Sequence, residues 1–225
     1  MSEREAPTPQ PRRWFHFSLR TLLLLALLIA LPLGWVAKER RQSTFEAELA
    51  VRLERAGWQF TRGSILDSTR DFHTHPRQIS WQHALAIRLF GERIIFAINS
   101  SAGQQELEQL AGLSNLQHLA VGTDDIVNLN FVNQHKVLKV LRIYCNREVQ
   151  KVDAKQEDLD LAPLRALPKL KILVIQNRQV NDLAPLQHLF SLEGIMLTGT
   201  RSTHEQVGRL RDALPNCTLT ITSNR

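Results

Sequence analysis

Three histidines stand close together in residues 71–83 (DFHTHPRQISWQH). His73, His75 and His83 could ligate a metal, because imidazole nitrogen is a common zinc ligand. Their spacing matches no zinc motif, and Pro76 makes the first pair part of a loop. We therefore interpret them as surface-loop histidines, and an enzyme with a metal site near His73–His83 is the third and least favoured hypothesis.

No other pattern in the sequence is typical of an active site. The chain lacks a glycine-rich phosphate loop, a strained serine turn and a Cys-x-x-Cys pair. Acidic pairs such as Asp124 with Asp125 are adjacent along the chain, so their side chains point in different directions and make a poor acid/base pair. The sequence predicts a protein without catalytic activity, cofactor or evident small-molecule substrate.

The two cysteines, Cys145 and Cys217, are too few for a disulfide framework. In the repeats described below they lie three coils apart, roughly 14 Å at ~4.8 Å per strand. A disulfide needs Cα atoms within about 7 Å, so the two are not expected to pair. Cys217 stands at a leucine position of its repeat, which predicts a core residue.

The net charge of +6 is concentrated at the N-terminus. Residues 1–41 hold seven basic and three acidic side chains, a net charge of +4, which leaves +2 for the rest of the chain. Binding to phosphates needs a concentrated basic face, and the remainder of the sequence offers none. We therefore expect no nucleic-acid partner.

An apolar segment follows a disordered basic tail over residues 1–18, which is rich in proline and charge. Thr21 to Ala37 contains no charge and lies between Arg20 and Lys38, so we expect a transmembrane helix over residues 19–38. Its seventeen residues span roughly 26 Å of helix, slightly less than a ~30 Å hydrocarbon core, and snorkelling of the two flanking cations covers the difference.

A cleaved signal peptide is the main alternative, because it also joins a basic start to an apolar run. A cleavage site ending at Ala37 places the bulky Trp35 within the recognition sequence, which favours an uncleaved anchor. Basic residues near the two ends of the segment are equal in number, a tie under the positive-inside rule. We favour a single-pass membrane protein with its soluble domain on the non-cytoplasmic side.

One short pattern, apolar-x-x-apolar-x-apolar, occurs five times in the second half of the chain. The units are Leu116, Leu119, Val121; Leu138, Leu141, Ile143; Leu170, Leu173, Ile175; Leu192, Ile195, Leu197; and Leu214, Cys217, Leu219. Successive first leucines are 22, 32, 22 and 22 residues apart, and Arg147 to Glu157 forms an insertion in the long interval. Each unit predicts a short parallel strand of an α/β leucine-rich-repeat solenoid over residues 101–225, because stacked coils bury a continuous core.

The stretches before the strands repeat as well, as in Leu161–Leu164 and Leu183–Leu186, both LAPL. Proline donates no ladder hydrogen bond and suits a turn or a helix start, so these stretches belong on the convex side.

Residues 42–100 predict an N-terminal α/β cap, and a further helix caps the other end. We expect a helix over Ser43 to Ala56 that stops at Gly57, a strand that contains Trp58 and Phe60, a second helix around Trp81 to Phe90, and a strand over Ile94 to Ile98. His204 to Leu214 predicts the C-terminal helix, which leads into the last strand.

The repeat unit resembles the bacterial leucine-rich repeat of the internalin type, as Gln176 to Leu186 (QNRQVNDLAPL) illustrates. The whole chain is similar to planctomycete-type membrane-anchored leucine-rich-repeat proteins in Phe17 to Leu22, Ala50 to Trp58 and Leu210 to Cys217. The resemblance covers nearly all of residues 15–221. It implies a bacterial protein with this fold and a membrane anchor, and it implies no particular activity.

The position of the usual asparagine ladder departs from this family. Three residues after the last strand leucine stand Asp124, Asn146, Arg178 and Thr200. Arginine cannot accept a hydrogen bond, so the coil stacking around Arg178 is expected to be loose or water-filled.

The side chains between the strand leucines predict a partner-binding concave face. One row is Ala120, Arg142, Val174, Met196 and Thr218, and its neighbour is Gly122, Tyr144, Gln176, Thr198 and Thr220. The candidate binding residues are Arg142, Tyr144, Val174, Gln176, Met196 and Thr198, with Arg142 and Tyr144 foremost because Arg and Tyr are enriched at interface hot spots. We expect a protein-binding scaffold; the alternatives are a merely solvated face and a structural cell-envelope protein that self-associates.

Overall fold

The computed structural model of the chain describes residues 19–63, 85–86, 88–89, 93–122, 128–145, 158–200 and 202–223. The chain divides into two compact units, Met1–Lys38 and Glu39–Arg225. The helix α1 (Leu19–Arg55) begins in the first unit and ends in the second.

The first unit contributes the apolar part of α1. The helical stretch Leu22–Arg55 is long and apolar enough to cross a membrane, and the leucines near its start are exposed in the structure. A signal sequence near the N-terminus has the same length and composition, so the helix alone does not distinguish an anchor from a signal peptide.

A single helix replaces the two that the sequence predicts over residues 19–38 and 43–56. The intervening Glu39, Arg40, Arg41 and Gln42 are all good helix formers, so no residue of this stretch ends the helix between the two predicted segments. The predicted stop at Gly57 is confirmed. Gly57 has φ 91°, the Trp58 N–H donates to the Leu53 carbonyl (3.1 Å) and the Gly57 N–H donates to the Glu54 carbonyl (3.1 Å), which together form a Schellman motif.

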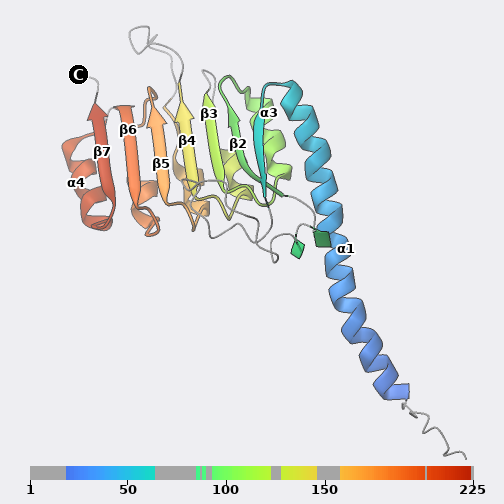
Figure 1. Cartoon of the computed structure of the whole chain (residues 1–225). Coiled ribbons are helices and arrows are strands. Elements are labelled where there is room, and N and C mark those ends of the chain that lie inside the picture. Colours follow the sequence, from blue (N-terminus) through green and yellow to red (C-terminus); the bar gives the residue numbers. More distant parts are fainter. Residues whose placement is uncertain are drawn as a thin grey trace, which may run out of the picture. The chain divides into compact units, whose positions relative to one another are not determined.

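Seven strands in the described residues form one sheet in sequence order (Figure 1). They are β1 (Gln59–Gly63), β2 (Arg93–Asn99), β3 (His118–Gly122), β4 (Val140–Tyr144), β5 (Ile172–Gln176), β6 (Gly194–Thr200) and β7 (Thr218–Ser223). β1 is antiparallel to β2, and every later pair is parallel. The predicted parallel strands of a solenoid are therefore confirmed.

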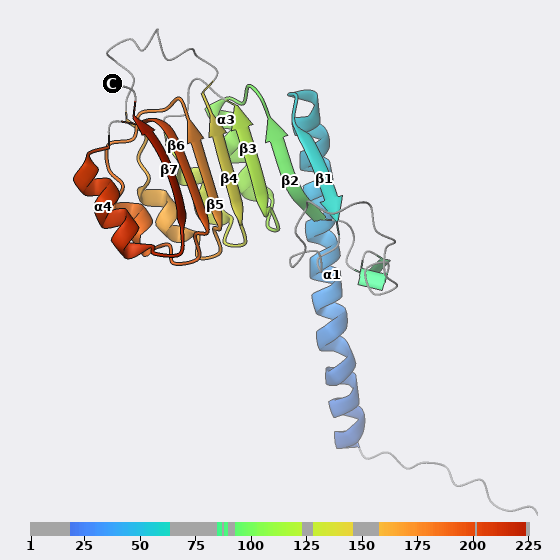
Figure 2. The same ribbon diagram turned by 60° about the vertical axis from the view of Figure 1, so that its left-hand side comes forward.

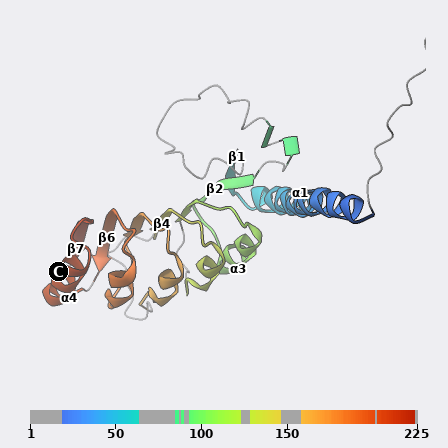
Figure 3. The ribbon, with the colours of Figure 1, turned by 90° about the horizontal axis from the view of Figure 1, so that it is seen from below.

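Short helices form a second layer on one side of the strands (Figures 2 and 3). They are α3 (Gln104–Gln109), α4 (His204–Ala213) and the 3-10 helices η2 (Leu110–Gly112), η3 (Asn130–Gln134), η5 (Ala162–Ala166) and η6 (Ala184–His188). Proline stands in the first turn of η5 and of η6, as the LAPL stretches predict. The second expected helix of the cap falls largely outside the described residues.

Each 3-10 helix of the middle coils starts at a side-chain acceptor that the sequence analysis did not single out. Asn128, Asp160 and Asp182 accept the backbone N–H two residues later, at 3.1, 2.8 and 2.9 Å. This Asx turn bends the backbone locally and so starts each convex segment. The repeated signal is Asn or Asp directly before the leucine that precedes η3, η5 and η6.

Neighbouring coils are joined by backbone hydrogen bonds where the strands begin. The Gln117 carbonyl accepts from the N–H groups of Lys139 and Val140, and the Lys139 carbonyl accepts in the same way from the next coil. Inside, the leucines of strands and convex segments form one continuous buried cluster. Because each coil contributes only one slice of this cluster, its leucines are covered by the coils on either side.

The C-terminal part of α1 closes the N-terminal end of this core. Glu46 is buried, and its Oε1 accepts from the Ser114 N–H (3.0 Å) and the Ser114 hydroxyl (2.9 Å). Gln42 Nε2 donates to the Gly112 carbonyl at 3.1 Å. A Cβ on Gly112 would lie 2.9 Å from the Leu49 and Phe45 side chains, so the helix packs directly on the first coil.

The last coil differs from the prediction by two residues. Leu219 pairs with Ile195 and Ile221 with Leu197, so the final interval is 24 residues and Cys217 precedes the strand. Cys217 is half-buried beside the core. Leu219 takes the inward position that the sequence analysis gave to Cys217. α4, with its capping box at Thr203, is a longer convex element than η5 or η6, which accounts for the longer coil.

The link between coils near Arg178 is made one residue earlier than predicted. Asn177, at φ 58°, donates from Nδ2 to the Cys145 carbonyl (3.4 Å) and from its backbone N–H to the Thr198 carbonyl (3.0 Å). It therefore joins the coils on both sides, and Arg178 at 7% exposure is buried rather than placed in a loose region. Asparagine tolerates the left-handed conformation that this position requires.

Gly122 allows the first coil to approach the cap. A Cβ at this position would lie 2.3 Å from the Ser100 carbonyl oxygen, whereas a Cβ on Gly194 in β6 meets nothing within 4 Å. Gly122→Ala is expected to lower the free energy of unfolding by about 1–3 kcal/mol, a typical effect of overpacking. Gly194→Ala is the matched control, and chemical denaturation gives the free energy of unfolding of both variants. Equal stability of Gly122→Ala and Gly194→Ala would contradict the prediction.

His135 makes stability depend on pH. It ends η3 at the position that leucine holds after η5 and η6, and its ring is fully buried. Burial lowers the pKa of His135 to about 4, although its Nδ1 bonds to the Leu113 carbonyl at 3.0 Å. The unfolded chain therefore binds the proton more tightly, so stability falls as the pH drops from about 6.5 to 4, by up to about 3 kcal/mol.

His135→Leu is expected to remove this loss. Denaturation of the wild type and the variant between pH 7 and 4 gives the difference in unfolding free energy at each pH. His188→Leu is the matched control, because His188 is exposed in the last turn of η6. A difference between His135→Leu and wild type that stays constant over this pH range would refute the assignment.

Candidate protein-interaction surface

The sheet has one face turned away from the leucine core, which we call the open face. The strand register places its residues in three rows across the strands. The first row is Phe96, His118, Val140, Ile172, Gly194 and Thr218; the second is Ile98, Ala120, Arg142, Val174, Met196 and Thr220; the third contains Gly122, Tyr144 and Gln176, with Thr198 opposite Thr222.

The structure brings the six predicted binding residues together on this face. Arg142, Val174 and Met196 are direct neighbours in the second row, and Tyr144 is opposite Gln176 in the third. The predicted positions of Thr218 and Thr220 are wrong by two residues. Thr220 stands beside Met196 because of the longer last coil, and Thr218 stands beside Gly194.

Burial alternates strictly along β5, as expected for a sheet with one covered face. In β3, by contrast, the open-face residues Ala120 and Gly122 are buried as well. Leu141, Leu173 and Ile195 point into the core and are at most 2% exposed. Arg142 and Val174 are half-buried, and Met196 is 38% exposed. The predicted binding residues Arg142, Val174 and Met196 are therefore accessible to a partner, whereas the inward leucines and isoleucine beside them are buried.

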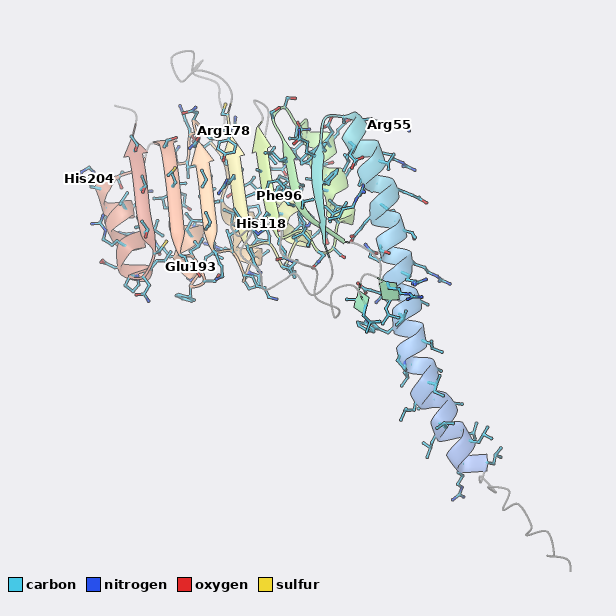
Figure 4. All side chains as sticks on the ribbon, viewed as in Figure 1. Arg55, Phe96, His118, Arg178, Glu193 and His204 are labelled. Atoms are coloured by element: carbon cyan, nitrogen blue, oxygen red, sulfur yellow. The ribbon has the colours of Figure 1, made fainter. Side chains whose placement is uncertain are left out.

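The open face extends further than the sequence analysis assigned. Phe96, Ile98, His118, Val140 and Ile172 also lie in the rows, and the rings of Phe96 and His118 meet across β2 and β3 at 6.1 Å between centroids (Figure 4). Residues 94–98 (IIFAI) are apolar at every position, so the sequence carries no signal that separates the outward Phe96 and Ile98 from core residues.

Polar contacts on the open face involve several of the predicted binding residues. Gln176 Nε2 approaches Met196 Sδ at 3.6 Å, and the Thr198 hydroxyl accepts from the Asn177 N–H at 3.3 Å. The residues of the three rows include no aspartate or glutamate, and Arg142 is the residue among them that carries a permanent charge. The face is thus mostly apolar around one guanidinium.

The other candidate sites add no chemistry in the described part of the chain. His73, His75 and His83 lie outside the described residues, so the metal-site hypothesis stays untested. Among the described residues, no three His, Cys, Asp or Glu side chains gather closely enough to hold a metal ion. Cys145 is buried, Cys217 is half-buried, and neither forms a disulfide.

Comparison with known proteins finds similarity only among solved structures. No protein-family model and no curated protein matches the chain. An internalin, InlF, from Listeria monocytogenes is 23% identical with a TM-score of 0.40 over 52% of this chain and 31% of that one. Internalin C2 from the same species is 23% identical with a TM-score of 0.37 over 52% and 46%. The chain spans less than half the length of either internalin, and its assignment as a leucine-rich-repeat solenoid rests on its own coils and strand register.

The two thiols are expected to react at very different rates. Burial raises the pKa of Cys217, so little thiolate is present at pH 7 and its reaction with a maleimide should speed up as the pH rises. Cys145 is expected to react only after unfolding. Mass spectrometry of the labelled full chain counts the modified thiols, and Cys217→Ser should abolish labelling of the folded protein. Equal labelling of both cysteines in the folded chain would contradict the structure.

Proposed function

We propose that this chain is a membrane-anchored binding module whose open face contacts another protein and which performs no chemistry of its own. The observation that carries the proposal is an apolar strip on the open face, formed by Ile172, Val174 and Met196. These three residues are neighbours on β5 and β6 and are half-buried or exposed. Phe96 and Ile98 form a second accessible apolar group on β2, separated from the strip by β3 and β4. Contiguous exposed apolar surface on a folded protein is typical of an interaction site.

Arg142 and Tyr144 give the strip its specificity. They stand next to each other along β4, in adjacent rows of the open face, and both are half-buried. A partly desolvated guanidinium binds a carboxylate in a fixed geometry, and tyrosine adds a large rigid contact with a polar end. We therefore expect a protein partner that presents apolar side chains and an aspartate or glutamate opposite Arg142.

The apolar part of α1 supports the anchoring half of the proposal. Its leucines are exposed, and the stretch has the length and composition of a membrane span. Leucines on every side of a helix suit lipid better than water. The soluble unit is proposed to lie on the non-cytoplasmic side, and an added surface cysteine that a membrane-impermeant thiol reagent labels in intact cells would support this side.

Photo-crosslinking tests the binding proposal in the full chain. A benzophenone amino acid at position 196, on the exposed part of the second row, is expected to form a discrete protein adduct in native membranes. Arg142→Ala or Tyr144→Ala should reduce the adduct at least tenfold, which corresponds to about 1.4 kcal/mol of binding free energy. Adduct yield is read by immunoblot and the partner by mass spectrometry.

Arg165→Ala provides the matched control. Arg165 lies exposed in η5 on the other side of the strands, so its loss should leave the adduct unchanged. All three variants are expected to keep the wild-type unfolding midpoint. Adduct yields that do not respond to Arg142→Ala and Tyr144→Ala would refute the open face as the binding site.

A further inference from the structure

β7 is one of the two edge strands of the described sheet, the other being β1. It is the last in the strand order and pairs only with β6. The Thr218 N–H donates to the Glu193 carbonyl at 2.9 Å, so Thr218 directs its backbone groups toward the preceding coil. Because backbone groups alternate along a strand, Leu219 and Ile221 direct their N–H and C=O groups to the free edge.

β7 lacks the sequence features that usually prevent an edge strand from pairing with another strand. Soluble proteins protect edge strands with charge, proline or bulges. The opposite edge, β1, has such protection, because its register with β2 shifts between Thr61 and Arg62, and Arg62 forms an ion pair with Glu54 at 3.2 Å. β7 (TLTITS) has no charge, proline or glycine, and keeps an unbroken register from Thr218 to Thr222.

Among the described residues, the leucine core is covered less completely at β7 than at β6. In β6 the inward residues Ile195 and Leu197 are at most 2% exposed. Their partners in the last strand, Leu219 and Ile221, pack against the same core but are only partly buried. Pairing of another strand with β7 would cover these two side chains and satisfy the edge backbone groups together.

We propose that β7 is a dimer interface, at which a second copy of this chain adds its own β7 in antiparallel orientation and extends the sheet across a two-fold axis. This inference does not depend on the proposed binding partner of the open face. The sequence analysis considered a protein that self-associates, and this proposal places the contact between the two copies at β7.

The sequence of β7 is complementary to itself in one antiparallel register. With the axis at Thr220, Leu219 of each copy stands opposite Ile221 of the other, and Thr218 stands opposite Thr222. Leu219 and Ile221 then exchange backbone hydrogen bonds, because their N–H and C=O groups point to the free edge. Leucine packs on isoleucine on the core side and threonine on threonine on the open face, and both are favourable cross-strand pairs.

The charges of the adjacent helix permit this approach. α4 carries Glu205, Arg209, Arg211 and Asp212, two acidic and two basic side chains, so two copies of α4 bring no net repulsion to the axis. A head-to-tail arrangement of β7 on β1 of the next copy is disfavoured by the charge and bulge of β1. The observations therefore favour a closed pair over an open fibre.

A site-directed cross-link tests the register. In the proposed pair the two Thr220 residues face each other at a non-hydrogen-bonded position, where Cα atoms are about 4.5 Å apart, within the range of a disulfide. Thr220→Cys in the full chain with Cys217→Ser is expected to give a covalent dimer under mild oxidation in detergent. Thr61→Cys in the same background is the matched control at the opposite edge, where Thr61 is also exposed, and should stay monomeric.

Sedimentation of the full chain without added cysteines gives an independent measurement. A monomer–dimer equilibrium is expected, and Thr220→Lys should weaken it at least tenfold because two like charges meet at the axis, whereas Thr61→Lys should not. A dimer that persists unchanged in Thr220→Lys, a monomer at all concentrations, or a cross-link between Thr220→Cys and Thr61→Cys chains would each overturn the two-fold β7 pair.

Discussion

No coil of this protein can cover its own leucines, so the register between neighbouring coils determines the rest of the structure. The inward residues Leu119, Leu141 and Leu173 stand opposite one another, and each is covered only because the next coil is aligned with it. A shift by one residue in any strand would turn leucines outward and the open-face residues inward. The rows that contain Arg142, Val174 and Met196 are therefore a direct consequence of the alignment that buries the core.

Local hydrogen bonds maintain this alignment at both ends of the strands. Just before the strands begin, the backbone N–H and C=O groups of residues such as Gln117 and Lys139 form hydrogen bonds with the backbone of the neighbouring coils. At the other end, Asn177 bonds to both adjacent coils and Gly122 allows the backbone of Ser100 to come close. On the convex side, His135 occupies a position that leucine holds after η5 and η6, and burial lowers the pKa of its ring to about 4.

Much of the fold could be predicted because leucine spacing reports directly on burial. The parallel strands, the helix stop at Gly57 and the convex prolines all follow from local chemistry that a sequence displays. The last coil was placed two residues wrong because Cys217 and Leu219 both fit the apolar pattern, and only the pairing of Leu219 with Ile195 distinguishes them. Asn177 was missed for a related reason, since its role depends on a backbone angle and on two carbonyls from other coils. Phe96, Ile98 and Ile172 could not be assigned to a surface until the register had shown which face each one occupies.

The two ends of the solenoid differ in a way that bears on how such a protein can change its length. α1 and the antiparallel β1 close one end through Glu46, Ser114 and Gln42, contacts that depend on the particular residues of the first coil. Interior coils meet only their neighbours through the same leucine columns and backbone bonds. Duplication of one 22-residue segment between β4 and β6 would therefore preserve every contact of the cap while widening the open face by one strand. The architecture can thus acquire a wider open face by tandem duplication in its middle, with the closed end inherited unchanged.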